Sequence, residues 1–104
     1  MRRVIWSARA AAAYRREVLD YLEQQGEAPL RRMRADVERA IEMLSQRLIG
    51  RPGRISGTYE KLVIGQPCII VYSLLPGDEG GQDDLAILRI VHTSRDWPPG
   101  RWPR

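Results

Sequence analysis

The spacing of hydrophobic residues changes once along the chain, near Gly53, and this change restricts the folds that the chain can adopt. Before Gly53, apolar residues recur every three or four positions, as on one side of an α-helix. After Gly53 they form short runs rich in β-branched residues, as in strands. A short apolar run at residues 1–6 precedes the helical part. The order strand, two helices, three strands predicts an α+β fold.

Two helices are expected, at residues 8–25 and 29–49. Ser7 is a favourable N-cap for the first helix and Gly26 is placed to end it. Pro29 lies where the first turn of the second helix tolerates proline, and Gly50 ends that helix. The short connection between them predicts an antiparallel hairpin. The expected apolar stripes are Ala11, Tyr14, Val18, Tyr21 and Leu22 in the first helix, and Leu30, Met33, Val37, Ile41, Leu44 and Leu48 in the second.

The second half of the chain predicts a three-stranded meander over residues 58–92, with strands at 59–64, 68–75 and 85–92. We expect an antiparallel sheet covered on one face by the helical hairpin. In the last strand, alternation would place Ala86, Leu88, Ile90 and His92 on one face. Residues 50–54 are expected to form a turn, and residues 93–104 an extended, proline-rich tail. The whole chain, 1–104, is interpreted as a single domain.

The composition is that of a globular protein that crosses no membrane. The chain is 43% hydrophobic and 29% charged. Its longest apolar stretch, residues 68–75, is too short to cross a bilayer as a helix. No secretory signal is visible, so we expect a cytoplasmic location. The aromatic residues Trp6, Tyr14, Tyr21 and Tyr72 are expected in the core.

The single cysteine and the single histidine do not predict a metal or cofactor site. Cys68 lies in an apolar run, where a buried and unreactive thiol is expected. One cysteine and one histidine without clustered carboxylates supply no recognisable ligand set, so no metal is expected. No motif for a phosphate-containing cofactor is present either.

The net charge of +4 is unevenly distributed along the sequence. Residues 77–84 contain four acids and no basic residue, so the remainder holds 17 basic and 9 acidic residues, a balance of +8. A basic body of this kind attracts an acidic protein or a nucleic acid, and the charge alone does not choose between them.

One group of polar residues has the composition that RNA cleavage needs: Arg51, Arg54, Glu60 and His92. Cleavage through the 2′-hydroxyl requires a base, an acid and cations around the phosphate. The alternative for His92 is a hydrogen-bonded residue at the margin of the sheet. Candidate contacts with a protein partner or target are Arg9, Arg15, Arg16, Arg95 and Arg101, which would otherwise be solvated surface residues. Trp97 and Trp102 either cover the core or anchor an interface.

Several segments, in their order, resemble the RelE/ParE superfamily of toxins, and the ParE branch more than the RelE branch. The resemblance spans nearly the whole chain, and the segments that carry it are residues 4–7, 48–51, 57–60, 65–72, 87–92 and 95–98. ParE-like sequences usually have an arginine where this chain has Tyr59 and a tyrosine where it has Cys68. RelE-like nucleases tend to have a basic residue in the strand 68–75, which has none here.

The resemblance implies the toxin of a type II toxin-antitoxin system, and three functions remain open. A ParE-like toxin inhibits DNA gyrase without being an enzyme. A RelE-like toxin cuts mRNA on the ribosome, with Arg51 and Arg54 holding phosphate and Glu60 or His92 transferring the proton. The third is a non-toxic basic binding module. Either toxin would be neutralised by a cognate antitoxin, ParD-like or RelB-like, in a hetero-oligomer.

Overall fold

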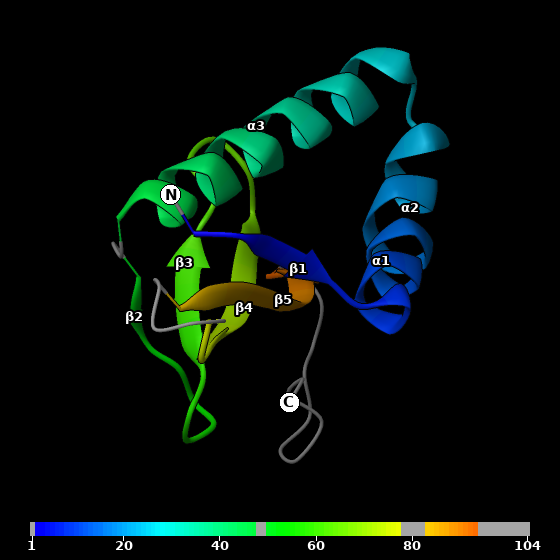
Figure 1. Cartoon of the computed structure of the whole chain (residues 1–104). Helices are drawn as coiled ribbons and strands as arrows, with labels where there is room; N and C mark the ends of the chain where they lie inside the picture. The colour runs from blue at the N-terminus through cyan, green and yellow to red at the C-terminus, as the bar shows by residue number, and fades with distance from the viewer. Residues whose placement is uncertain (1, 48–49, 78–82, 94–104) are drawn as a thin grey trace.

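A five-stranded sheet with helices packed against it forms the fold in the computed structural model, which describes residues 2–47, 50–77 and 83–93 (Figure 1). The strands are β1 (Val4–Trp6), β2 (Arg51–Pro52), β3 (Tyr59–Leu62), β4 (Cys68–Leu75) and β5 (Asp84–His92). Their order across the sheet is β1-β5-β4-β3-β2. The predicted α+β class and the three-stranded meander are confirmed.

The sheet is mixed, so the prediction of an antiparallel sheet is wrong for its first strand. β1 runs parallel to β5, with Val4 opposite Leu85 and Trp6 opposite Ile87, while the other three pairs of strands are antiparallel. Parallel neighbours need a long crossover connection, and the two helices and the meander provide it. Sequence periodicity reports which residues are apolar and carries no information on strand direction.

The first helical segment has no break, but its middle part is a π-helical turn, which we call the π-turn. It consists of α1 (Ala8–Tyr14), η1 (Arg15–Leu19) and α2 (Asp20–Glu23). Ser7 caps it as predicted, its Oγ accepting a hydrogen bond from the Ala10 N–H at 3.0 Å. The extra residue of the π-turn changes the buried side, so that Val18 and the next residue, Leu19, are both buried. Tyr21 is 52% exposed, which makes its predicted core position wrong.

The second helix, α3 (Glu27–Gln46), starts two residues earlier than predicted. Its expected apolar stripe is confirmed within the described residues: Met33, Val37, Ile41 and Leu44 are buried, and Leu30 is half-buried against them. Leu48 lies outside the described residues. In Figure 1, α3 runs along one side of the sheet and α1 and α2 stand beside β1 and β5.

Two further differences from the expected strands have local causes. Residues 51–52 form strand β2 against β3, where a turn was predicted. In β5 a bulge opposite Val71 and Tyr72 interrupts the alternation, so Leu85, Ile87 and Ile90 pack towards the helices. Leu88 and Val91 belong to the opposite side, and the predicted face containing both Leu88 and Ile90 is therefore wrong.

The main core lies between the helices and one face of the sheet, which we call the inner face. It contains Cys68, Ile70 and Tyr72 of β4 together with buried residues of both helical segments. The alternate residues Ile69 and Val71, with Val91, form a smaller buried cluster on the outer face. Trp6 and Tyr14 are half-buried at the margin of the main core. None of the described helices is both long and apolar enough to span a membrane.

Candidate functional site

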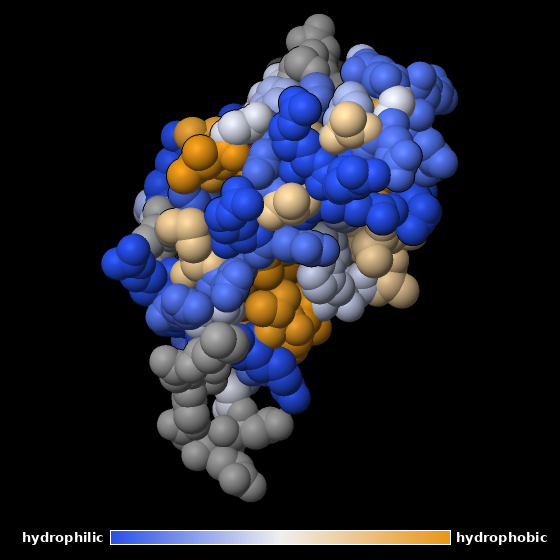
Figure 2. Space-filling view, turned by 90° about the horizontal axis from the view of Figure 1, so that it is seen from above, coloured by the Kyte–Doolittle hydropathy of each residue, from blue (hydrophilic) through white to orange (hydrophobic). Residues whose placement is uncertain are grey.

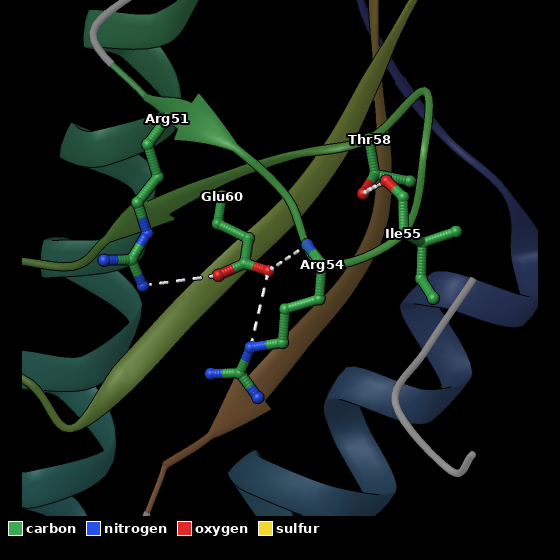
Figure 3. A network of polar contacts seen from close by, with 5 residues as sticks. All are labelled: Arg51, Arg54, Ile55, Thr58 and Glu60. Carbon is green, nitrogen blue, oxygen red and sulfur yellow. Dashed lines mark hydrogen bonds and ion pairs between the residues drawn. The ribbon is translucent and has the colours of Figure 1, made fainter. Parts of the chain in front are cut away.

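The side chains of Arg51, Arg54 and Glu60 meet at one end of the sheet (Figure 3). Arg51 Nη2 donates to Glu60 Oε1 at 3.3 Å, and the backbone N–H of Arg54 donates to Glu60 Oε2 at 2.9 Å. The Arg54 Nε lies 3.8 Å from the same Oε2. We call these three residues the arginine fork, because one carboxylate holds two guanidinium groups.

The loop between β2 and β3 places the fork. Gly53 N–H donates to the Thr58 carbonyl at 2.8 Å, and both the N–H and the hydroxyl of Thr58 donate to the Ile55 carbonyl. Gly57 has a φ of 84°, a backbone conformation that favours glycine. This turn, with the pairing of Arg51 opposite Glu60, brings the Arg54 N–H over the carboxylate.

The three side chains of the fork differ in exposure: the acid is buried and the two arginines are accessible. The side chain of Glu60 is 2% exposed, whereas those of Arg51 and Arg54 are 60% and 55% exposed. The carboxylate is therefore occupied in holding the loop, and the guanidinium groups face solvent. Planar guanidinium groups in this position are suited to binding phosphate or carboxylate.

The fourth residue of the predicted cleavage set, His92, lies elsewhere. It pairs with Cys68, an inner-face residue, whereas Glu60 pairs with Val71 on the outer face. Two strand spacings across the sheet and three residues along β4 place the two backbones about 14 Å apart. The imidazole packs edge-on against Tyr21, with ring centroids 6.1 Å apart. The structure brings together Arg51, Arg54 and Glu60, and it does not bring His92 to them.

A second feature is an open groove between the first helical segment and α3, with a volume of about 570 Å³. Trp6 and Tyr14 stack in it with centroids 5.7 Å apart. Burial raises the pKa of the Tyr14 hydroxyl, which is buried without a hydrogen-bond partner. The remaining lining residues are Arg15 and Leu19 on the first helical segment, and Arg34, Val37, Glu38, Ile41 and Glu42 on α3.

The predicted contact residues of the first helix are on the surface, and one of them belongs to this groove. Arg9, Arg15 and Arg16 are all exposed, and Arg15 lines the groove itself. The other four predicted contact residues, Arg95, Trp97, Arg101 and Trp102, lie outside the described residues.

Sequence reasoning missed the groove because it assigned Trp6 and Tyr14 to the core. One available signal is the spacing of Arg34, Glu38 and Glu42, which lie four residues apart along one line of α3 and next to Val37 and Ile41. A charged line bordering an apolar stripe marks the margin of a buried face, where a groove can open.

Cys68 shows no feature of a reactive residue. Its thiol is fully buried, 3.7 Å from the sulfur of Met33, and its burial was predicted. Burial raises its pKa to about 11. Among the described residues, no three His, Cys, Asp or Glu side chains gather as metal ligands.

Comparison with known proteins connects this arrangement to one family. Residues 4–97 match the family described as the ParE toxin of the type II toxin-antitoxin system, parDE. The chain is also similar to a protein of Sinorhizobium fredii (strain NBRC 101917 / NGR234) named "Putative toxin Y4kP". The two are 30% identical over 98 residues, which cover 93% of this chain and 94% of that protein. The family match includes all five strands and all helices of the fold, and the chain belongs to the ParE toxin family of type II toxin-antitoxin systems.

Proposed function

We propose that this protein inhibits DNA gyrase by binding it and stalling it with its DNA cleaved, and that it does so without being an enzyme. Membership of the ParE family supports gyrase as the target. The separation of His92 from the arginine fork supports inhibition by binding.

The relative positions of Glu60 and His92 favour binding over catalysis. A general base and a general acid that act on one phosphodiester must both lie within hydrogen-bond reach of the reacting atoms. The backbones of Glu60 and His92 lie about 14 Å apart and their side chains belong to opposite faces of the sheet, an arrangement that does not suit action on one phosphate. The Glu60 carboxylate is also engaged by the Arg54 N–H and both guanidinium groups, so its contacts are those of a residue that holds the loop in place.

A cognate antitoxin is the partner that membership of a toxin-antitoxin family implies. We propose that a ParD-like or RelB-like antitoxin binds across the groove and forms a hetero-oligomer. Arg15 lines the groove together with the stacked Trp6 and Tyr14, and Arg9 and Arg16 are exposed on the same helical segment. An acidic segment with apolar side chains would match this combination. Arg95, Trp97, Arg101 and Trp102 are proposed as further contacts with the antitoxin or the target. A gyrase inhibitor would act in the cytoplasm.

The deciding experiment is a gyrase supercoiling and DNA-cleavage assay with the purified protein, with and without its antitoxin. We expect loss of supercoiling, accumulation of cleaved DNA, and reversal of both by the antitoxin. Unchanged supercoiling and cleavage at saturating protein would contradict the proposal.

A translating extract tests the enzymatic alternative in parallel. Codon-dependent cuts in mRNA that disappear in Arg54→Ala or His92→Ala would favour a RelE-like nuclease over gyrase inhibition. Expression in growing cells tests the third possibility, because a binding module without toxicity would accumulate as soluble protein without slowing growth.

A further inference from the structure

We propose that the arginine fork binds the phosphate backbone of duplex DNA. The inference rests on the proposed function only in its choice of nucleic acid, because gyrase holds duplex DNA when the toxin acts on it. The site consists of the exposed guanidinium groups of Arg51 and Arg54, and Glu60 is a positioning residue behind them.

The guanidinium groups of the fork are held in place before any ligand arrives. Arg51 and Arg54 contact different oxygens of one carboxylate that is 2% exposed. The Arg54 backbone is bonded to the same carboxylate, so the position of the loop is also set. A side chain held in this way loses less conformational entropy on binding than a freely rotating surface arginine does. Figure 3 shows both arginines extending from the same side of the β2–β3 unit towards Glu60.

Charge is unevenly distributed between the helices and the rest of the fold. The helical segments, residues 8–23 and 27–46, contain seven arginines and seven acids and are therefore neutral. The remaining described residues contain seven basic side chains and three acidic ones, which accounts for the whole balance of +4. Within the described ranges, the basic residues outside the helices are Arg2, Arg3, Arg47, Arg51, Arg54, Lys61 and Arg89. Figure 2 shows that the surface on the side of α3 is largely hydrophilic. Because the charges of the helical segments cancel, these segments add little net attraction for an anion.

This distribution of charge favours binding of a regular polyanion over binding of a single acidic group. Duplex DNA presents closely and evenly spaced phosphates, and a protein gains affinity for each phosphate that its cations neutralise. The fork supplies two adjacent contacts, and the net charge of the strands and their connections adds attraction of longer range. An acidic protein segment would also pair with the arginines, and the experiment below distinguishes it from DNA.

The test is fluorescence anisotropy of a labelled 20-base-pair duplex titrated with the full chain at several salt concentrations. We expect salt-dependent binding that Arg51→Ala/Arg54→Ala weakens roughly 10-fold, with the log–log salt slope reduced by about 2. The matched control, Arg31→Ala/Arg39→Ala, removes two exposed arginines from the neutral helical layer. We expect it to change the affinity less than threefold.

Two more variants separate positioning from total charge. Arg51→Lys/Arg54→Lys keeps the charge and loses the planar donors, so it should bind DNA more weakly than the wild type. Glu60→Gln raises the net charge by one and loosens the fork, so the proposal expects weaker binding where charge alone would give tighter binding. Circular dichroism melting checks that each variant is folded. If Glu60→Gln is unfolded, the lysine variant alone distinguishes the positions of the guanidinium groups from their total charge.

The proposal is overturned if the wild type does not bind the duplex at 50 mM salt, or if fork and control variants weaken binding equally. It is also overturned if the fork variant binds DNA normally and loses only its antitoxin, because the ligand is then a protein. Gyrase inhibition by a protein whose fork does not bind DNA would refute this inference and leave the proposed function standing. Fork-dependent DNA binding without any effect on gyrase would support this inference and refute the proposed function.

Discussion

Glu60 contacts both Arg51 and Arg54, but removal of the acid and removal of an arginine would have different effects on the structure. The acid is buried and accepts a hydrogen bond from the Arg54 backbone N–H, whereas both guanidinium groups remain mostly in water. Loss of the acid leaves that N–H of the β2–β3 loop without its acceptor. Loss of the Arg51 side chain removes one contact of the acid, which keeps its contacts with the Arg54 N–H and guanidinium group.

We therefore expect unequal effects on stability. Glu60→Ala should lower the free energy of unfolding by about 2–3 kcal/mol, as for loss of hydrogen bonds to a charged group. Arg51→Ala should lower it by less than about 1 kcal/mol. Urea unfolding measures both, with Glu27→Ala as the control, since Glu27 is an exposed acid paired with Arg31. A Glu60→Ala protein as stable as Glu27→Ala would refute the structural role of Glu60.

The buried Cys68 makes the fold sensitive to alkaline pH. Its pKa is about 11 in the folded protein against an ordinary value of 9.0, because burial penalises the thiolate. The stabilisation from the protonated thiol is thus complete below about pH 9 and is lost as the pH rises through 11. The pKa of Tyr72 is raised as well, also by burial, so its contribution has the same sign.

Unfolding free energies measured from pH 8 to pH 11 should therefore fall, and the fall should be smaller in Cys68→Ala. The thiol contributes up to about 3 kcal/mol of the pH-dependent change. At pH 8 the native thiol should not react with a disulfide reagent until denaturant is added. Rapid labelling of the native protein would show that the cysteine is accessible.

At the level of helices and strands, the sequence predicted type and order well, and it did not predict irregularities. Capping by Ser7 and the stripe of α3 were readable because each depends on neighbours in sequence. The π-turn at residues 15–19 and the bulge opposite Val71 and Tyr72 depend on packing between elements. For the same reason the sequence could group Glu60 with His92, while only strand register shows that they lie on opposite faces.

Gly50, which precedes β2, lies very close to the sheet. A Cβ on Gly50 would lie 2.3 Å from the Tyr72 hydroxyl oxygen and 2.8 Å from the Glu60 carbonyl oxygen. Gly50→Ala should thus destabilise the protein by about 1–3 kcal/mol through overpacking. In Gly50→Ala/Tyr72→Phe the loss should be less than the sum of the two single losses, because the hydroxyl is gone. Thermal melts of the four proteins give the coupling, and strict additivity would contradict this geometry.

For the whole molecule, the helical layer is neutral and the remainder is basic, so the residues that attract an antitoxin over long range need not be those that contact it. Long-range attraction of an acidic antitoxin depends on the total charge, whereas residence in the complex depends on local contacts. Arg9, Arg15 and Arg16 are proposed as local contacts, and Arg31, Arg32 and Arg39 are exposed arginines of α3 that are not.

Replacement of either set of three by alanine should slow association with the antitoxin, and more so at low ionic strength. Only Arg9→Ala/Arg15→Ala/Arg16→Ala should also speed dissociation, by about 10-fold or more. Surface-based or stopped-flow kinetics of the two triple variants give both rates. Equal dissociation rates would place the antitoxin elsewhere on the toxin.

The pairing of β1 with β5 also has a consequence for how the molecule is made. Ribosomes synthesise the chain from its first residue, yet Val4–Trp6 have their strand partner at residues 85–87. The sheet therefore cannot close until residues 85–87 have been translated, and contacts of such wide sequence separation slow folding. A nascent or truncated product that stops before residue 84 lacks both β5 and the partner of its first strand. A fragment released early would therefore lack the completed sheet of the toxin fold.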